Sequence, residues 1–209
     1  MIISAADRNR FNCHINHSAY AKANNVEYKF YDSLKIKEHF NFMKIYAILD
    51  AFNKADHVLY LDDDAFFTNV FWNYKSIFES NPGDIIVAES PRRNEGKTPI
   101  FNSGVIFLRR TPEVINLLNN VLEIGEIRGN NDYEWKTSWG SAVGGDQDTL
   151  IYLTQTKYKG IASIIEQTKI NARPYDYDTI LHPIVHFAGK QKPIELFCKN
   201  VCDIYNINM

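Results

Sequence analysis

The chain has 209 residues, a formal net charge of -2 and 45% hydrophobic residues. A chain of this size and balance can bury its own core, so we expect one domain spanning 1–209. The absence of a basic block disfavours general nucleic-acid binding. The three cysteines, Cys13, Cys198 and Cys202, are too sparse for a disulfide framework.

We expect no targeting signal at the start of this sequence. Met1-Ile2-Ile3-Ser4 runs directly into charged residues, without the positive region and apolar stretch of a signal peptide. No segment approaches the ~20 apolar residues that a membrane span needs. We therefore expect a cytoplasmic protein without a membrane span, either by itself or as part of a larger chain. Its oligomeric state is left open.

Short apolar runs alternate with helical patterns along the chain, which is typical of an α/β domain. We predict strands at 1–6, 28–31, 58–61, 85–88, 104–108 and 184–187. We predict helices at 17–24, 40–53, 111–122 and 148–155. The segment 125–145 between the last two helices is polar and contains several glycines, so it is the best candidate for a loop that closes over a ligand.

Three aspartates follow one of the predicted strands. Asp62, Asp63 and Asp64 come directly after the apolar run 58–61. Adjacent carboxylates repel each other unless a cation lies among them, and open α/β sheets bind ligands at the carboxyl ends of their strands. Carboxylate oxygens are ligands that divalent cations prefer. The placement favours a metal site at Asp62 and Asp64, with a solvated acidic turn as the alternative.

Further polar motifs lie near other predicted element ends. His186 ends a strand and offers a ring nitrogen to a metal. Gly189 permits close backbone approach to an anion, and Lys192 offers an ammonium group to a phosphate. Asn102 enters a strand, and Asp146-Gln147-Asp148 opens a helix; both motifs present groups for sugar hydroxyls. Taken singly, these motifs have structural alternatives: a core histidine, ordinary turns and a helix N-cap.

Taken together and in this order, the motifs resemble the GT-A glycosyltransferases of family 8, which include the bacterial lipopolysaccharide galactosyltransferases and glycogenin. The resemblance extends from about residue 2 to 193. Lys44 stands where that family usually has an arginine, and Ile194 replaces its usual tryptophan. The segments that carry the resemblance are Ile3-Ser4-Ala5-Ala6-Asp7-Arg8-Asn9, Tyr60-Leu61-Asp62-Asp63-Asp64, Phe101-Asn102-Ser103-Gly104-Val105, Asp146-Gln147-Asp148 and 186–193.

The resemblance implies one Rossmann-like GT-A domain, with a mixed, mostly parallel central sheet flanked by helices. It implies metal-dependent transfer of a hexosyl group from a UDP-sugar to a glycan or glycoprotein acceptor, with retention of the anomeric configuration. Mn²⁺ is the expected ion because mixed carboxylate and imidazole ligands suit it better than Mg²⁺, the other candidate.

The resemblance also assigns roles to individual residues of this sequence. The implied metal ligands are Asp62, Asp64 and His186. The residues implied to act on the transferred sugar or the leaving diphosphate are Asp146, Gln147 and Lys192. The residues implied to bind the donor are Ala5, Asp7, Asn9, Lys44, Asp63, Asn102, Gly104, Gly189 and Lys192.

Other assignments compete with this one. A family of α-mannosyl and α-xylosyltransferases has a similar aspartate motif, and a compact capsid-decorating glycosyltransferase domain of large algal viruses fits the chain length. The viral alternative would place the enzyme in the host cytoplasm. A nucleotidyltransferase would need a Gly-rich basic loop near the first strand, which Ala5-Ala6-Asp7-Arg8 is not. A degenerate module that binds a nucleotide-sugar or glycan without turnover would not need all the implied metal ligands.

Overall fold

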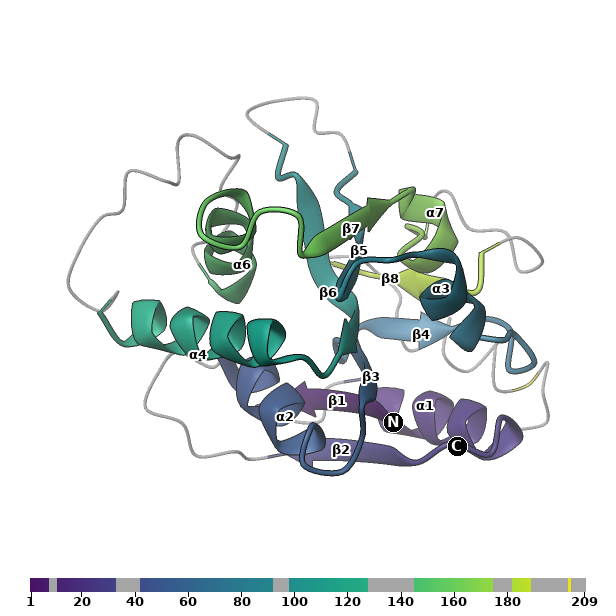
Figure 1. Ribbon diagram of the computed structural model, residues 1–209. Coiled ribbons are helices and arrows are strands. Elements are labelled where there is room, and N and C mark those ends of the chain that lie inside the picture. Colours follow the sequence, from purple (N-terminus) through teal and green to yellow (C-terminus); the bar gives the residue numbers. More distant parts are fainter. Residues whose placement is uncertain are drawn as a thin grey trace.

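The computed structural model describes residues 1–7, 11–32, 42–91, 98–127, 145–174, 182–188 and 203. Its centre is a six-stranded sheet in the order β2-β1-β3-β6-β5-β7 (Figure 1). The strands are β1 (Ile2–Ala6), β2 (Tyr28–Asp32), β3 (His57–Leu61), β5 (Ile85–Glu89), β6 (Phe101–Arg109) and β7 (Ala162–Ile165). Strand β6 runs antiparallel to its neighbours β3 and β5, whereas the other neighbouring pairs are parallel. The predicted mixed, mostly parallel sheet is confirmed.

A second, two-stranded sheet joins distant parts of the chain. Strand β4 (Ala65–Phe67) follows β3 after a short turn and pairs antiparallel with β8 (Ile184–His186). In this register Ala65 lies opposite His186. The pairing therefore carries the end of β8 to the turn between β3 and β4, where the three aspartates lie.

Helices cover both faces of the central sheet. They are α1 (Cys13–Ala23), α2 (Met43–Ala51), α3 (Lys75–Ser80), α4 (Pro112–Ile127), α6 (Asp146–Gln155) and α7 (Gln167–Ile170). Figure 1 shows α2, α4 and α6 on one side and α1, α3 and α7 on the other. Because strand side chains alternate between faces, Ile3 and Tyr60 join the core of the first side, and Ile2 and Leu59 join that of the second.

Helix α4 forms where the capping pattern predicts a helix. The Thr111 hydroxyl oxygen accepts a hydrogen bond from the backbone N–H of Val114 at 3.3 Å. Pro112 occupies the first helical position, where its missing N–H removes no helical bond. The helix continues to Ile127, so the first residues of the predicted loop at 125–145 are helical. Residues 128–144 of that loop lie outside the described residues.

Helix α1 begins at Cys13, four residues before the predicted start at 17. Its buried face includes Asn16 and His17, whose polar side chains interrupt the apolar periodicity. Both find hydrogen-bond partners inside the fold. A polar side chain with satisfied hydrogen bonds can be buried at modest cost. A prediction based on apolar spacing therefore misses the first turn of this helix.

The other differences concern element ends and short elements. Helix α6 begins at Asp146 rather than at 148, and β6 begins at Phe101 rather than at 104. The short elements β4, α3, β7 and α7 have no counterpart among the predicted elements. Both earlier starts bring polar site residues into regular structure, because Asn102 becomes part of a strand and Asp146 part of a helix.

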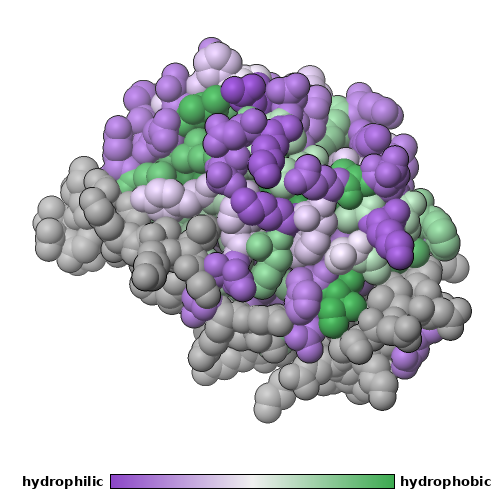
Figure 2. Space-filling view, turned by 90° about the horizontal axis from the view of Figure 1, so that it is seen from below, coloured by the Kyte–Doolittle hydropathy of each residue, from purple (hydrophilic) through white to green (hydrophobic). Residues whose placement is uncertain are grey.

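The described surface is largely polar on the face seen in Figure 2, where hydrophilic side chains predominate. Among the described residues, no helix has the length and apolar character needed to cross a membrane.

Candidate functional site

A cavity of about 310 Å³ lies where the ends of several elements meet. Strands β1 and β3 end there, β6 begins there because it runs antiparallel to β3, and α6 also begins there. Open α/β sheets bind ligands at this edge. The residues assigned to the site from the sequence that line this cavity are Ala5, Asp7, Lys44, Asp62, Asp63, Asp64, Asn102, Asp146, Gln147 and His186.

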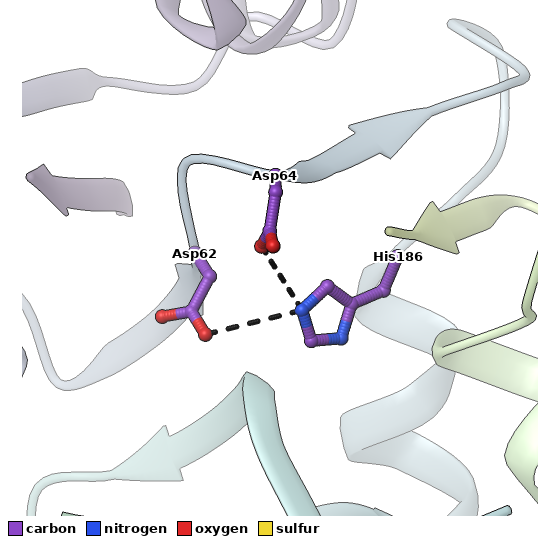
Figure 3. A group of neighbouring side chains, drawn as sticks. All are labelled: Asp62, Asp64 and His186. Atoms are coloured by element: carbon purple, nitrogen blue, oxygen red, sulfur yellow. Dashed lines mark ion pairs between the residues drawn. The ribbon is translucent and has the colours of Figure 1, made fainter. Parts of the chain in front are cut away.

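Asp62, Asp64 and His186 all line this cavity, and Figure 3 shows their side chains pointing toward one another. His186 Nε2 lies 3.0 Å from Asp64 Oδ1 and 4.0 Å from Asp62 Oδ2. The contact follows from the pairing of β4 with β8, which is extended by a hydrogen bond from Phe187 N to the Asp64 carbonyl oxygen at 2.9 Å. Residues 122 positions apart in the sequence thus become neighbours.

These three side chains fit a divalent cation. One ligand atom from each lies within 4.8 Å of the others. Two ligands at about 2.1–2.5 Å from one ion lie no more than about 4–5 Å apart, so only a small adjustment would let all three bind it. A carboxylate oxygen and an imidazole nitrogen that carries no hydrogen are both acceptors, so their 3.0 Å approach is favourable only with a proton or a cation between them.

Two donors hold the other oxygen of Asp62. The Tyr60 hydroxyl donates to Asp62 Oδ1 at 2.9 Å, and the Lys44 ammonium lies 3.0 Å from the same oxygen. Burial, and then the Asp62 charge, raise the pKa of Tyr60 well above its usual value, so its hydroxyl keeps its proton and remains a donor. With Oδ1 held in this way, Asp62 turns Oδ2 toward His186.

Lys44 links this carboxylate to a second one. Its Nζ lies 3.1 Å from Asp146 Oδ2 and donates to the Ser103 carbonyl oxygen at 3.0 Å. Burial by itself lowers the pKa of Lys44, but Asp146 and Asp62 outweigh it and raise the pKa, so the ammonium stays charged. Burial raises the pKa of Asp146, and the Lys44 charge acts against that rise. Ser103 Oγ also donates to Asp146 Oδ2, at 2.9 Å.

Gln147 and Asn102 form an amide pair whose orientation is set by the backbone. The Ser103 backbone N–H donates to Gln147 Oε1 at 3.0 Å, and Asn102 Nδ2 donates to the same oxygen at 3.1 Å. A backbone N–H can only donate, so the Gln147 atom facing it is the carbonyl oxygen. The Gln147 Nε2 group has no hydrogen-bond partner among the described residues, and Gln147 is one of the residues that line the cavity.

Asn171 connects this amide pair to His186. Its Nδ2 donates to Asn102 Oδ1 at 2.8 Å, and its Oδ1 lies 2.9 Å from His186 Nδ1. Asn171 is fully buried and follows α7. It belongs to none of the motifs in the sequence, and an asparagine after a short helix gives no signal of a role in a site.

Gly104 is needed for the position of the His186 ring. A Cβ atom at residue 104 would lie 2.0 Å from His186 Cε1, far inside van der Waals contact. Gly104 was predicted to bind the donor, but it is not among the described residues that line the cavity. The space left by the missing side chain is occupied by the imidazole ring.

Three residues predicted to bind the donor, Asn9, Gly189 and Lys192, lie outside the described residues. The cavity also has lining residues that the sequence analysis did not assign. Tyr60 and Ser103 are two of them, and both hold a carboxylate of the site. Both lie in segments that carry the resemblance, but the sequence analysis assigned no role to either side chain.

Comparison with solved structures shows that the chain has the GT-A fold of glycosyltransferases. It is similar to a glycosyltransferase involved in the glycosylation of the major capsid of PBCV-1, with a TM-score of 0.73 and 14% identity over 95% of this chain and 98% of that chain. The expected resemblance in fold to such glycosyltransferases is confirmed.

Two other structures share the fold. GlyE from Streptococcus pneumoniae TIGR4 matches with a TM-score of 0.63 and 16% identity, over 96% of this chain and 60% of that chain. The galactosyltransferase LgtC, in complex with donor and acceptor sugar analogs, matches with a TM-score of 0.53 and 15% identity, over 97% of this chain and 95% of that chain. No protein-family model and no curated protein sequence matches the chain.

Proposed function

We propose that the chain is a metal-dependent glycosyltransferase that moves a hexosyl group from a UDP-sugar to a glycan or glycoprotein acceptor, with retention of the anomeric configuration. The observation that carries this proposal is the convergence of Asp62, Asp64 and His186 beside a cavity at the ligand-binding edge of a GT-A sheet. A bound Mn²⁺ would offset the negative charge that develops on the departing diphosphate.

The residues at the end of β1 suit the nucleoside of the donor. Ala5 and Asp7 line the cavity there, and Asp63 lines it beside the metal ligands. In this proposal Ala5 and Asp7 bind the uracil and ribose, and Asp63 contacts the ribose. Asn9 is assigned to the nucleoside by the resemblance alone. The same holds for Gly189 and Lys192, which are assigned to the diphosphate.

Asp146 and Gln147 take different tasks on the transferred sugar. Asp146 Oδ2 accepts bonds from Lys44 and Ser103, whereas its Oδ1 has no partner within the described residues. That oxygen is free to face the positive charge that develops at the anomeric carbon. The Gln147 oxygen already accepts two hydrogen bonds, so this residue offers its NH₂ group to a sugar hydroxyl.

Calorimetry tests the metal site directly. We expect the wild-type chain to bind UDP in the presence of Mn²⁺, and Asp64→Ala to lose that Mn²⁺-dependent binding. Asp56→Ala is the matched control, because Asp56 is an exposed carboxylate that pairs with Arg110. Retained Mn²⁺-dependent UDP binding by the Asp64 variant would contradict the proposed site.

Turnover separates an enzyme from a binding module. The wild-type chain is incubated with Mn²⁺ and a panel of UDP-sugars, with and without glycan acceptors, and free UDP is measured. We expect UDP release from at least one donor, increased by the correct acceptor. Tight binding of a UDP-sugar without any UDP release would instead support the module that binds without turnover.

A further inference from the structure

Asn171 lies between the amide pair of the cavity and the imidazole of the candidate metal centre. Its side chain is fully buried, and both of its polar atoms are engaged, Nδ2 with Asn102 and Oδ1 with His186. The neighbouring backbone is tied to the same strand, because His186 N donates to the Ala172 carbonyl oxygen at 2.8 Å. Asn171 is therefore held in place from two sides.

The direction of each hydrogen bond in this chain of contacts can be deduced from one backbone group. The Gly104 backbone N–H donates to Asn102 Oδ1 at 2.9 Å, which identifies that atom as the carbonyl oxygen. The Asn171 atom 2.8 Å from this oxygen must then be the NH₂ group. The remaining Asn171 atom is its carbonyl oxygen, and the His186 nitrogen that faces it must donate.

We propose that Asn171 is a positioning residue that keeps a hydrogen on His186 Nδ1, so that Nε2 is the nitrogen that binds a divalent cation. Nε2 is the ring atom that faces Asp64 and Asp62, at 3.0 and 4.0 Å. The missing side chain at Gly104 leaves room for the ring in this orientation. Partners of this kind fix the tautomer of a metal-bound histidine and increase its basicity. The inference rests on the proposed metal-dependent function.

The first test measures Mn²⁺ affinity by electron paramagnetic resonance, without nucleotide or sugar. Asn171→Leu has similar volume but offers the His186 N–H no acceptor, and we expect it to bind Mn²⁺ about 10- to 100-fold more weakly. Asn171→Asp keeps an oxygen acceptor for Nδ1 but loses the NH₂ group that donates to Asn102 Oδ1, and we expect it to bind Mn²⁺ more tightly than Asn171→Leu does. The control Asn24→Leu removes another bonded asparagine, whose Nδ2 donates to the carbonyl oxygens of Tyr20 and Val70, and should leave affinity unchanged.

The second test reads the tautomer in the wild-type chain, so it does not depend on a variant that folds. In ¹⁵N-labelled protein loaded with diamagnetic ¹¹³Cd²⁺, we expect His186 to carry its hydrogen on Nδ1 and to show coupling between cadmium and Nε2. A metal bound through Nδ1 would overturn the inference. So would unchanged Mn²⁺ affinity in a folded Asn171→Leu variant. A wild-type chain that binds no divalent cation would instead refute the proposed function itself, and the inference with it.

Discussion

Replacing Gly104 with alanine tests how tightly the fold holds His186. The new Cβ would lie 2.0 Å from His186 Cε1, about 1.4 Å inside ordinary van der Waals contact, which begins near 3.4 Å. His186 is 2% exposed, so its ring is enclosed by the fold and cannot turn into solvent. The clash must therefore move the imidazole or the β6 backbone, and overpacking of this kind costs about 1–3 kcal/mol of the free energy of unfolding.

Moving the ring should also weaken cation binding. Because His186 Nε2 is one of three candidate ligands, we expect Gly104→Ala to lower Mn²⁺ affinity at least about tenfold. Calorimetry measures the affinity, and urea unfolding without metal measures the stability. Gly83→Ala is the matched control, because its Cβ would lie 2.5 Å from Ser163 Oγ, outside the residues that line the cavity. It should lose stability but not affinity. Wild-type stability and affinity in Gly104→Ala would refute this account of the glycine.

Three further predictions concern the polar side chains of Lys44, His17 and Gln147. Lys44→Met leaves Asp62 and Asp146 without their shared cation, so urea unfolding should show a loss of about 3 kcal/mol. Burial lowers the pKa of His17 from 6.5 to about 4, so the unfolded chain binds a proton that the folded chain excludes. The contribution of His17 to the free energy of unfolding should be fully present above pH 6.5, and up to about 3 kcal/mol of it should be lost as the pH decreases toward 4. Unfolding of His17→Gln, measured across the same pH range, should lack this pH dependence. Gln147→Glu keeps the oxygen that accepts from the Ser103 N–H but replaces the NH₂ group with a second oxygen. Turnover of the UDP-sugar should fall, whereas Mn²⁺ affinity should stay unchanged. Normal turnover would exclude the proposed hydrogen bond from the Gln147 NH₂ group to a sugar hydroxyl.

The sequence predicts those parts of the fold that local patterns encode. Strands β1, β3 and β5 are short apolar runs, and α4 begins with a capping threonine and a proline, so their positions follow from periodicity and capping. The start of α1 was missed because Asn16 and His17 lie on its buried face. Strand β4 has three residues, too few for a period-two pattern to stand out.

The site was predictable to the extent that it lies in contiguous motifs. Asp62 and Asp64 follow a buried strand, and the resemblance added His186 to them. Asn171 could not be found in this way, because its importance depends on two long-range contacts, with Asn102 and with His186. The task of Gly104 was also hidden, since a glycine near a strand start is commonly a turn residue and the imidazole it accommodates lies 82 positions later.

The pairing of β4 with β8 has a consequence for the mobility of the chain. Two candidate ligands belong to the turn that leads into β4, and the third ends β8. A bound cation would therefore link the two strands of this two-stranded sheet. Separating them would then require release of the ion. At a free ion concentration of about 100 times the Kd, that linkage adds about 2.7 kcal/mol to the opening free energy. The ion would thus hold β8 against the turn before β4 and slow the exchange of β8 amide hydrogens with water.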